Sequence, residues 1–331
     1  MSKKQLFIHV GFPKTGTTTL QNSLFKNHSE LEYLNDKIDF QIFKEIRESS
    51  SISFNSNFKN LTEEISKHIK LSLKEKFIIS NEGFTSTAMH YGKVKRYNKS
   101  ELIIFPDSIT VIRNLNFLKE EIKDLVDVHI LLCLRNQFDF LKTYYAQEYN
   151  RFYSINKETN TFEKFIDFSL KNEENFMLES INYYNIVKNY SFYFGKEKTH
   201  ILLFENLIED QKKYYQYLAI NILKINVDES IKLTVNKKFN SKKTADGYKT
   251  DGIRLSKRIA KIASVLNFQP KIGLTNTKFF KSLEKIRINQ KHLEKLEYSS
   301  DIKGVLIEKF KDNNKLLFLE YDIESQSHKY Y

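Results

Sequence analysis

The chain has 331 residues, of which 53 are Lys or Arg and 41 are Asp or Glu, giving a formal net charge of +12. An apolar content of 40% and an aromatic content of 14% exclude a disordered chain, because this composition can bury a hydrophobic core. The single cysteine, Cys133, excludes an intramolecular disulfide, and the positive charge favours an anionic ligand such as a phosphate, a sulfated sugar or a nucleic acid.

Short apolar segments along the chain predict the strands of a parallel sheet. Each is followed by a segment with helical spacing, such as 138–149 and 211–222. The predicted strands are 6–10, 77–79, 129–134 and 200–204. Strands of this kind are buried on both faces by flanking helices. The pattern predicts an α/β fold, a P-loop-type central parallel sheet flanked by helices, with helical or irregular insertions at 32–75 and 85–125.

The last part of the chain predicts helices at 253–265, 279–296 and 302–310, where apolar and charged residues are mixed. The segment 236–251 is rich in Lys, Asn, Ser, Thr and Gly, which is typical of a loop. We therefore expect an α/β core at 1–235, a basic loop at 236–251, and a helical region at 252–331 that completes the same domain.

A Gly/Thr-rich loop follows the first predicted strand. Residues 11–19 read Gly-Phe-Pro-Lys-Thr-Gly-Thr-Thr-Thr and lead into a helical pattern around Leu20 and Leu24. In this position backbone N–H groups and the positive end of a helix dipole face an anion, and Thr17, Thr18 and Thr19 add hydroxyl donors. The structural alternative is an ordinary turn with a threonine helix cap.

The loop departs from the P-loop of nucleotide triphosphatases. Gly11 and Gly16 have the P-loop spacing, but Thr17 stands where that loop has its lysine, and the lysine is moved forward to Lys14. A magnesium-dependent kinase also needs an acidic residue at the end of a neighbouring strand, whereas the strand 129–134 ends in Arg135. We expect a site for an anionic nucleotide that uses no metal.

At these residues the chain resembles the family of sulfotransferases that use 3'-phosphoadenosine 5'-phosphosulfate (PAPS), in particular bacterial members that act on carbohydrates. The family's loop, which binds the 5'-phosphosulfate, is matched by Pro13, Lys14, Thr15, Gly16, Thr17 and Thr18. Thr19 extends the same loop. The resemblance implies that PAPS is the donor and 3',5'-bisphosphoadenosine (PAP) the product.

A second signature of the family is Arg-Asn-Pro with a serine eight residues after the arginine. Here Arg135 and Asn136 are followed by Gln137, and Thr143 stands at the eighth position. The resemblance implies that Arg135 and Thr143 bind the 3'-phosphate. Weaker similarities are the Phe-Glu-Asn-Leu that ends 200–207 and the segment 305–323, which contains Asn313.

Three residues are candidates for the chemistry. Lys14 can stabilise charge on the leaving oxygen, although it can also lie beside the loop without acting. Glu82 follows the strand 77–79 and resembles the base of carbohydrate sulfotransferases, with a helix-start carboxylate as the alternative. His9 is the rival base, but a lone histidine in an apolar strand is more often a core residue.

The remaining expectations concern partners and location. One of the lysines in 237–243 is expected at the nucleotide, and Tyr144, Tyr145 and Tyr149 either line a sugar site or belong to the core. The favoured function is sulfuryl transfer to the hydroxyl of a carbohydrate or another acceptor, with a kinase or a basic polyanion-binding protein as alternatives. No nucleic-acid motif or transmembrane segment is found, the oligomeric state is open, and we expect a bacterial, cytoplasmic protein.

Overall fold

The structure is a computed structural model of the whole chain. It describes residues 3–50, 62–89, 107–154, 157–172, 177–237, 243–244, 247–250, 253–254, 287–288, 290–293, 296–323 and 330. The chain divides into two compact units. The first comprises Met1–Gln137, Ser169–Phe239 and Gly304–Tyr331, and the second Phe138–Phe168 and Asn240–Lys303.

The first unit is built on a five-stranded sheet in the order β2-β3-β1-β4-β5. All four neighbouring pairs are parallel. The strands are β1 (Lys4–His9), β2 (Leu31–Tyr33), β3 (Lys76–Ser80), β4 (Val126–Leu134) and β5 (Thr199–Leu203). The predicted α/β fold is confirmed, with four predicted strands present at shifted ends and the short β2 unpredicted.

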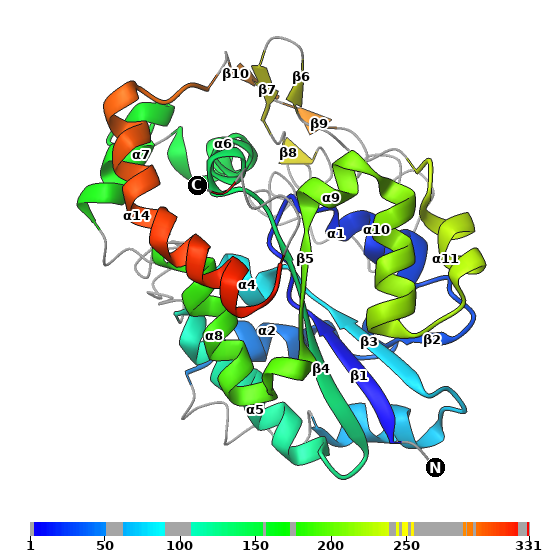
Figure 1. Cartoon of the computed structure of the whole chain (residues 1–331). Coiled ribbons are helices and arrows are strands. Elements are labelled where there is room, and N and C mark those ends of the chain that lie inside the picture. The colour runs from blue at the N-terminus through cyan, green and yellow to red at the C-terminus, as the bar shows by residue number, and fades with distance from the viewer. Residues whose placement is uncertain are drawn as a thin grey trace, which may run out of the picture. The chain divides into compact units, whose positions relative to one another are not determined.

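Helices cover both faces of this sheet (Figure 1). One face carries α2 (Phe40–Glu48), α4 (Gly83–Met89), α5 (Ser108–Ile122), η5 (Glu179–Ile181), α8 (Tyr183–Phe194) and, near its end, η6 (Lys196–Lys198). The other face carries α1 (Thr17–Thr19), η1 (Leu20–Phe25), α9 (Phe204–Glu209), α10 (Gln211–Tyr217), η7 (Leu218–Leu223) and α11 (Val227–Thr234). The short η2 (Leu34–Asp36) contacts β3. Among the described residues, no helix is long and apolar enough to cross a membrane.

The core of the unit follows from the alternation of side chains along the buried strands. Phe7, Leu131 and Leu202 point to the face of α10, where they pack with Leu20 and Leu218. Their neighbours in sequence point to the opposite face, so both sides of each strand are apolar. This explains why the strands read as continuous apolar runs in the sequence.

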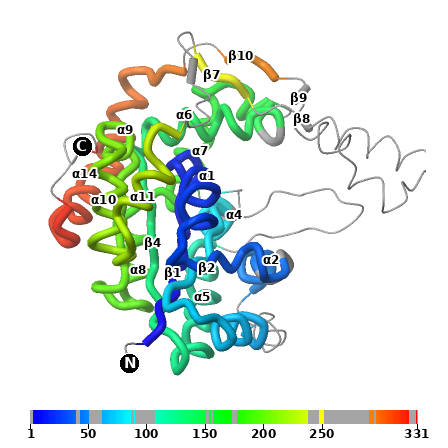
Figure 2. Tube along the Cα trace, turned by 90° about the vertical axis from the view of Figure 1, so that its right-hand side faces the viewer, coloured from blue at the N-terminus to red at the C-terminus, as the bar shows by residue number. Residues whose placement is uncertain are grey.

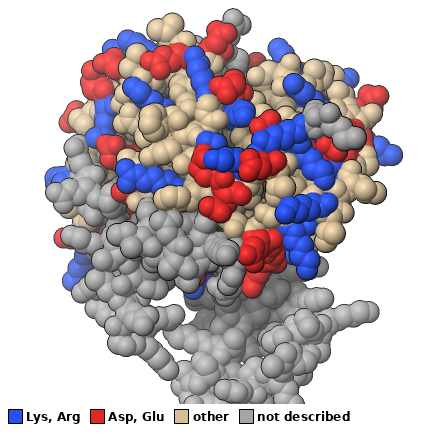
Figure 3. Space-filling view, turned by 90° about the horizontal axis from the view of Figure 1, so that it is seen from below, with Lys and Arg blue, Asp and Glu red and all other residues tan. Residues whose placement is uncertain are grey.

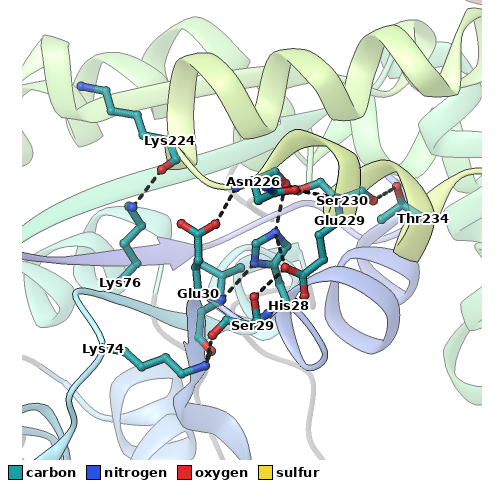
Figure 4. Close-up of polar contacts among 11 residues, drawn as sticks. His28, Ser29, Glu30, Lys74, Lys76, Lys224, Asn226, Glu229, Ser230 and Thr234 are labelled. Carbon is teal, nitrogen blue, oxygen red and sulfur yellow. Dashed lines mark hydrogen bonds and ion pairs between the residues drawn. The ribbon is translucent and has the colours of Figure 1, made fainter.

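A polar network fastens α11 to the turn before β2 (Figure 4). Glu229 accepts hydrogen bonds from the backbone N–H of Ser29 at 2.8 Å and from its hydroxyl at 2.6 Å. Asn226 donates its N–H to the Glu30 carboxylate at 2.8 Å, and its carbonyl accepts from His28 Nε2 at 3.1 Å. These contacts lie at the amino end of β2, so they stabilise the helical layer at the edge opposite to the carboxyl ends of the strands.

The second unit combines helices and short strands. Its helical elements are α6 (Gln137–Glu148), η3 (Tyr149–Tyr153) and the start of α7 (Phe162–Lys171). Its core is aromatic, because the Tyr145 ring lies 5.2 Å from Tyr153 and 5.2 Å from Phe165, and both Tyr144 and Tyr145 are 1% exposed. Tyr144 and Tyr145 are therefore core residues, and Tyr149 packs edge-on against Tyr145.

Two helices predicted near the end of the chain are wrong where the structure describes them. The strands there are β6 (Lys243–Thr244), β7 (Gly247–Lys249), β8 (Ile253–Arg254), β9 (Arg287–Ile288) and β10 (His292–Leu293). β8 pairs with β9, and β10 pairs with β7, both antiparallel. Pairing between distant segments overrides a weak local pattern. The helix predicted at 302–310 is confirmed by α14 (Ser300–Glu320).

The carboxyl ends of the parallel strands gather at one edge of the sheet. Figure 2 shows β1 running from the N-terminus to α1 at its other end. The residues that follow the strands at this edge are the loop 10–16, Glu82, Arg135 and Phe204. Ligands of open α/β sheets bind at this edge, beside the strand where the order of connection reverses. In the present order that strand is β1.

Candidate functional site

The loop after β1 is anchored on β4 and then turns back sharply. Val10 N–H donates to the Leu131 carbonyl at 3.0 Å, and Phe12 N–H donates to the Cys133 carbonyl at 3.3 Å. The Thr15 hydroxyl donates to the Phe12 carbonyl at 2.5 Å. Lys14 has a positive φ of 66°, which is uncommon for a residue with a side chain. The loop is thus a tight, internally bonded turn that delivers the chain into α1.

Gly16 ends the turn in a conformation that a side chain would strain. It caps α1 with φ 81° and ψ 8°, in the left-handed region. A Cβ at this position would also lie 2.7 Å from Leu207 Cδ2, on the α9 segment that follows β5. Gly11 is equally confined, because its Cβ would lie 2.6 Å from His9 Nε2. Both glycines of the predicted loop are therefore required by close approach.

The loop presents backbone donors at the start of a helix. Among the described residues, no group accepts from the backbone N–H of Thr15, Gly16, Thr17 or Thr18, whereas Thr19 N–H donates to the Gly16 carbonyl at 3.0 Å. Thr18 is exposed, and α1 continues directly into η1. Several N–H groups converging on one point make an anion site, so the donor set fits a phosphate or a phosphosulfate.

Glu82 lies against this loop from the end of β3. Its Oε1 accepts a hydrogen bond from the Thr17 hydroxyl. Thr85, one turn further on, donates its hydroxyl to the Gly11 carbonyl at 3.3 Å, which ties the start of α4 to the loop. Burial raises the pKa of the Glu82 carboxyl to about 7, and the nearby positive charge of Lys14 opposes this rise. The structure therefore brings Glu82, Thr17 and Lys14 together.

Arg135 reaches the same loop from the end of β4. Its Nη1 donates to the Lys14 carbonyl at 3.2 Å, and its guanidinium lies 4.8 Å above the ring centre of Phe204. The Tyr183 hydroxyl donates to the Arg135 carbonyl at 2.7 Å. The cation is held beside the phosphate loop by stacking and hydrogen bonding. The loop and the Arg-Asn pair, 121 residues apart from Lys14 to Arg135, thus form one site.

His9 lies in the core beneath the loop. It is 1% exposed, its Nδ1 is 2.7 Å from the Ser80 hydroxyl, and its Nε2 is 3.4 Å from Cys133 Sγ. Burial lowers the pKa of the imidazole to about 3, so the ring is neutral at physiological pH. Both ring nitrogens have partners inside the protein, which is typical of a core histidine.

The other predicted residues have local contacts. Pro13 and Thr15 are buried in the turn, and Thr19 is 8% exposed at the start of the helix. In the second unit, the Thr143 hydroxyl donates to the carbonyls of Asp139 and Phe140 in its own helix, at 2.9 and 3.0 Å. Its role at the 3'-phosphate stays a prediction.

The lysines predicted to close over the nucleotide are only partly described. Lys237 follows α11, and Lys243 is in β6. Residues 238–242 lie outside the described residues, so the choice among these lysines also stays a prediction.

The structure adds site residues that sequence analysis did not single out. Tyr183 and Phe204 contact Arg135 directly, and the Glu205 carboxylate accepts the N–H of Asn136 at 2.9 Å. Phe204 and Glu205 belong to the Phe-Glu-Asn-Leu segment, so a signal was present for these two. Tyr183 follows no strand and stands in no motif.

The charges of the described residues are mixed rather than sorted. Figure 3 shows a face on which Lys and Arg lie beside Asp and Glu, with no broad area of one sign among the side chains described there. Ion pairs such as Lys26–Asp36, at 2.6 Å, place charges of opposite sign side by side. In the described part of the chain, no three His, Cys, Asp or Glu side chains are grouped so that they could hold a metal ion.

Comparison with known proteins relates the chain to one family. The family model of the sulfotransferase domain matches residues 3–259. No curated protein matches the sequence. Among solved structures, the chain is similar to a sulfotransferase from Alicyclobacillus acidocaldarius, with 13% identity, a TM-score of 0.46, and 97% of each chain covered.

Two further solved structures are similar over most of their length. One is the sulfotransferase domain of an olefin synthase from Synechococcus, with 8% identity, a TM-score of 0.40, and coverage of 94% of this chain and 95% of that chain. The other is the mouse sulfotransferase SULT7A1 in complex with PAP, with 14% identity, a TM-score of 0.35, and coverage of 98% of this chain and 86% of that chain.

Proposed function

The chain belongs to the sulfotransferase domain family, and on that premise we propose that it moves a sulfuryl group from PAPS to an acceptor hydroxyl, with a carbohydrate as the favoured acceptor. The observation that carries the proposal is the meeting of the Gly11–Thr19 loop, Glu82 and Arg135 at the carboxyl ends of β1, β3 and β4. These groups supply the anion site, the base and the cation that the reaction needs.

Two parts of the site bind the two ends of PAPS. The N–H groups of 15–18 and the Lys14 ammonium bind the 5'-phosphosulfate, because they form a compact set of donors around one helix start. Arg135 binds the 3'-phosphate, since a guanidinium donates two parallel hydrogen bonds to phosphate oxygens. Thr143 and one lysine of 237–243 complete this part in our proposal.

The transfer step needs a base and a stabilised leaving group. The acceptor oxygen forms a bond to sulfur, the bond from sulfur to the bridging oxygen of the 5'-phosphate breaks, and the hydroxyl proton goes to the Glu82 carboxylate. The products are a sulfate ester and PAP. Lys14 stabilises the negative charge that develops on the departing phosphate.

Glu82 is better suited than His9 to the role of base. A carboxyl with a pKa of about 7 is half ionised at neutral pH and close to the optimum for proton transfer. His9 is buried with both nitrogens engaged by Ser80 and Cys133, so an acceptor hydroxyl cannot reach it without displacing the core. We therefore assign the base to Glu82 and leave His9 a structural role.

Calorimetric titration of the purified chain tests the proposal. We expect PAP to bind in the absence of magnesium. Arg135→Ala should weaken the affinity for PAP by about 10- to 100-fold, because it removes a charge-assisted hydrogen bond to phosphate. Arg113→Ala is the matched control, because this exposed arginine on α5 contacts the Tyr193 hydroxyl instead. A preference for ATP with magnesium over PAP would contradict the proposal and favour a kinase.

The acceptor and the location are proposed on sequence grounds. Carbohydrate is favoured because the loop and the Arg-Asn pair resemble those of bacterial carbohydrate sulfotransferases. Transfer from radiolabelled PAPS to a panel of glycans, phenols and amines would identify the acceptor class. A bacterial source and a cytoplasmic location rest on the Lys-, Asn- and Ile-rich composition and the lone Cys133.

A further inference from the structure

The segment that carries Arg135 is held at each of its residues. The Arg135 carbonyl accepts from Tyr183, and the Asn136 N–H donates to Glu205 Oε1 at 2.9 Å. The Gln137 side chain, 1% exposed, donates its Nε2–H to Asn314 Oδ1 at 2.8 Å. The position of the arginine is thus set by contacts to three other elements of the first unit.

The contacts of Asn136 and Gln137 close into a ring through Tyr330. The Tyr330 hydroxyl donates to Glu205 Oε2 at 2.7 Å, so one carboxylate receives both Asn136 and Tyr330. The Tyr330 carbonyl accepts from Asn314 Nδ2 at 2.6 Å, which returns the chain of hydrogen bonds to Gln137. Two consecutive residues are therefore joined by a closed path of hydrogen bonds, which runs through side chains and through the backbone groups of Asn136 and Tyr330.

Three members of the ring are buried, namely Gln137, Asn314 and Tyr330, whereas Asn136 and Glu205 are half-buried. Tyr330 is 2% exposed and Asn314 is 1% exposed, and the Tyr330 ring lies 5.1 Å from Phe318 on α14. Buried hydrogen bonds of this kind are costly to break because the groups left behind have no water to replace the lost partner. The ring therefore restricts the segment more than exposed contacts would.

Gln137 stands at the first position of α6, where a proline would restrict φ by its own ring. Glutamine has no such restriction. In this chain two hydrogen bonds hold the position of the segment instead: Asn314 holds the Gln137 side chain, and Glu205 holds the Asn136 N–H. Glutamine at position 137 can therefore replace proline, because the ring of hydrogen bonds takes over the task of fixing the segment.

We propose that Glu205, Gln137, Asn314 and Tyr330 are positioning residues that orient Arg135 toward the 3'-phosphate of the nucleotide. The inference rests on the proposed function, in which Arg135 binds that phosphate. It assigns α14 and Tyr330, which contact no part of the phosphate loop in the described contacts, a role in the choice of nucleotide. None of the four residues needs to touch the donor.

The test compares two nucleotides that differ only in the 3'-phosphate. The dissociation constants of PAP and 5'-AMP are measured by calorimetry for the wild type and for Tyr330→Phe, which removes one hydroxyl and keeps the ring. We expect the preference for PAP to fall by about threefold to tenfold while 5'-AMP binding stays within about twofold. A merely structural loss would weaken both nucleotides together.

Tyr184→Phe is the matched control. Its hydroxyl donates to Glu320 on α14 at 2.8 Å, so it also joins α14 to the body of the unit by a tyrosine-carboxylate bond, but it is not a member of the ring around Asn136 and Gln137. The control should keep the wild-type preference for PAP. Thermal unfolding of each variant shows that the chain is folded at the temperature of titration.

A second pair of variants separates positioning from packing. Asn314→Leu opens the ring and should lower the preference for PAP as Tyr330→Phe does. The double variant Gln137→Pro/Asn314→Leu should regain most of it, because proline restores the restriction on φ. If Tyr330→Phe and Asn314→Leu both keep the preference for PAP over 5'-AMP while Arg135→Ala loses it, this inference alone is overturned. If Arg135→Ala also keeps that preference, the proposed role of Arg135 is overturned and the inference with it.

Discussion

Replacement of Glu82 by glutamine tests the chemistry of the site most directly. Glutamine keeps the size of the side chain and can still accept the hydrogen bond from Thr17, but it cannot take a proton from the acceptor. General bases contribute about 10²- to 10⁴-fold to rate, so we expect kcat to fall by this factor. Binding of PAP should change by less than about threefold, because the loop amides and Arg135 remain.

The pH dependence of the wild type follows from the same carboxyl. Its pKa of about 7 means that the ionised fraction is about one tenth at pH 6 and about nine tenths at pH 8. Since the base acts when ionised, kcat should rise by about fivefold from pH 6 to pH 7, approach tenfold per pH unit only well below pH 6, and level off above about pH 8. The Glu82→Gln variant should lack this rise.

The assay is PAP release from PAPS, with an acceptor from the glycan panel, between pH 5.5 and 8.5. A Glu82→Gln variant that keeps wild-type kcat, or that keeps the rise of kcat centred near pH 7, would refute the assignment of the base.

The dependence of stability on pH gives an independent check of the Glu82 pKa. The folded-state pKa lies above the ordinary value of 4.5, so stability is lost as pH rises through the interval from 4.5 to about 7, on the order of 3 kcal/mol, and Glu82→Gln should raise the Tm at pH 8.

Other residues give further expectations. Gly16→Ala should cost roughly 1–2 kcal/mol of stability from the left-handed φ alone and should weaken PAP binding, because the methyl group meets Leu207; calorimetry and thermal melts check both. His9 has a folded pKa of about 3 against the ordinary 6.5, so unfolded chains take up a proton first and the His9 contribution to the urea-unfolding free energy should decrease from pH 7 to pH 5, opposite in sign to the Glu82 contribution. The test therefore uses Glu82→Gln, whose unfolding free energy should decrease over this interval by more than that of Glu82→Gln/His9→Gln; an equal decrease would contradict the assignment. Ser29→Ala removes one bond to Glu229 and should cost about 1 kcal/mol without any change in the Kd for PAP.

Much of the site follows from local sequence. A run of apolar residues with a Gly/Thr turn behind it has few alternatives to a strand, a loop and a helix, so the loop after β1 was predictable. The same reasoning placed Glu82 and Arg135 after β3 and β4, and parallel strands bring their carboxyl ends to one edge. The short β2 was missed because three residues carry no usable periodicity.

Only the tertiary structure decided which distant residues contact one another. The sequence determined the α/β fold, the anion loop and the candidate base, since each depends on residues within one or two turns. Long-range packing decided that His9 is enclosed by Ser80 and Cys133, that Thr17 meets Glu82, and that Tyr330 and Asn136 meet at the Glu205 carboxylate. Long-range contacts of this kind join residues as far apart as Ser29 and Glu229, which are 200 positions apart. No local pattern encodes them, because burial and hydrogen bonding in the core depend on which segments the whole chain brings together.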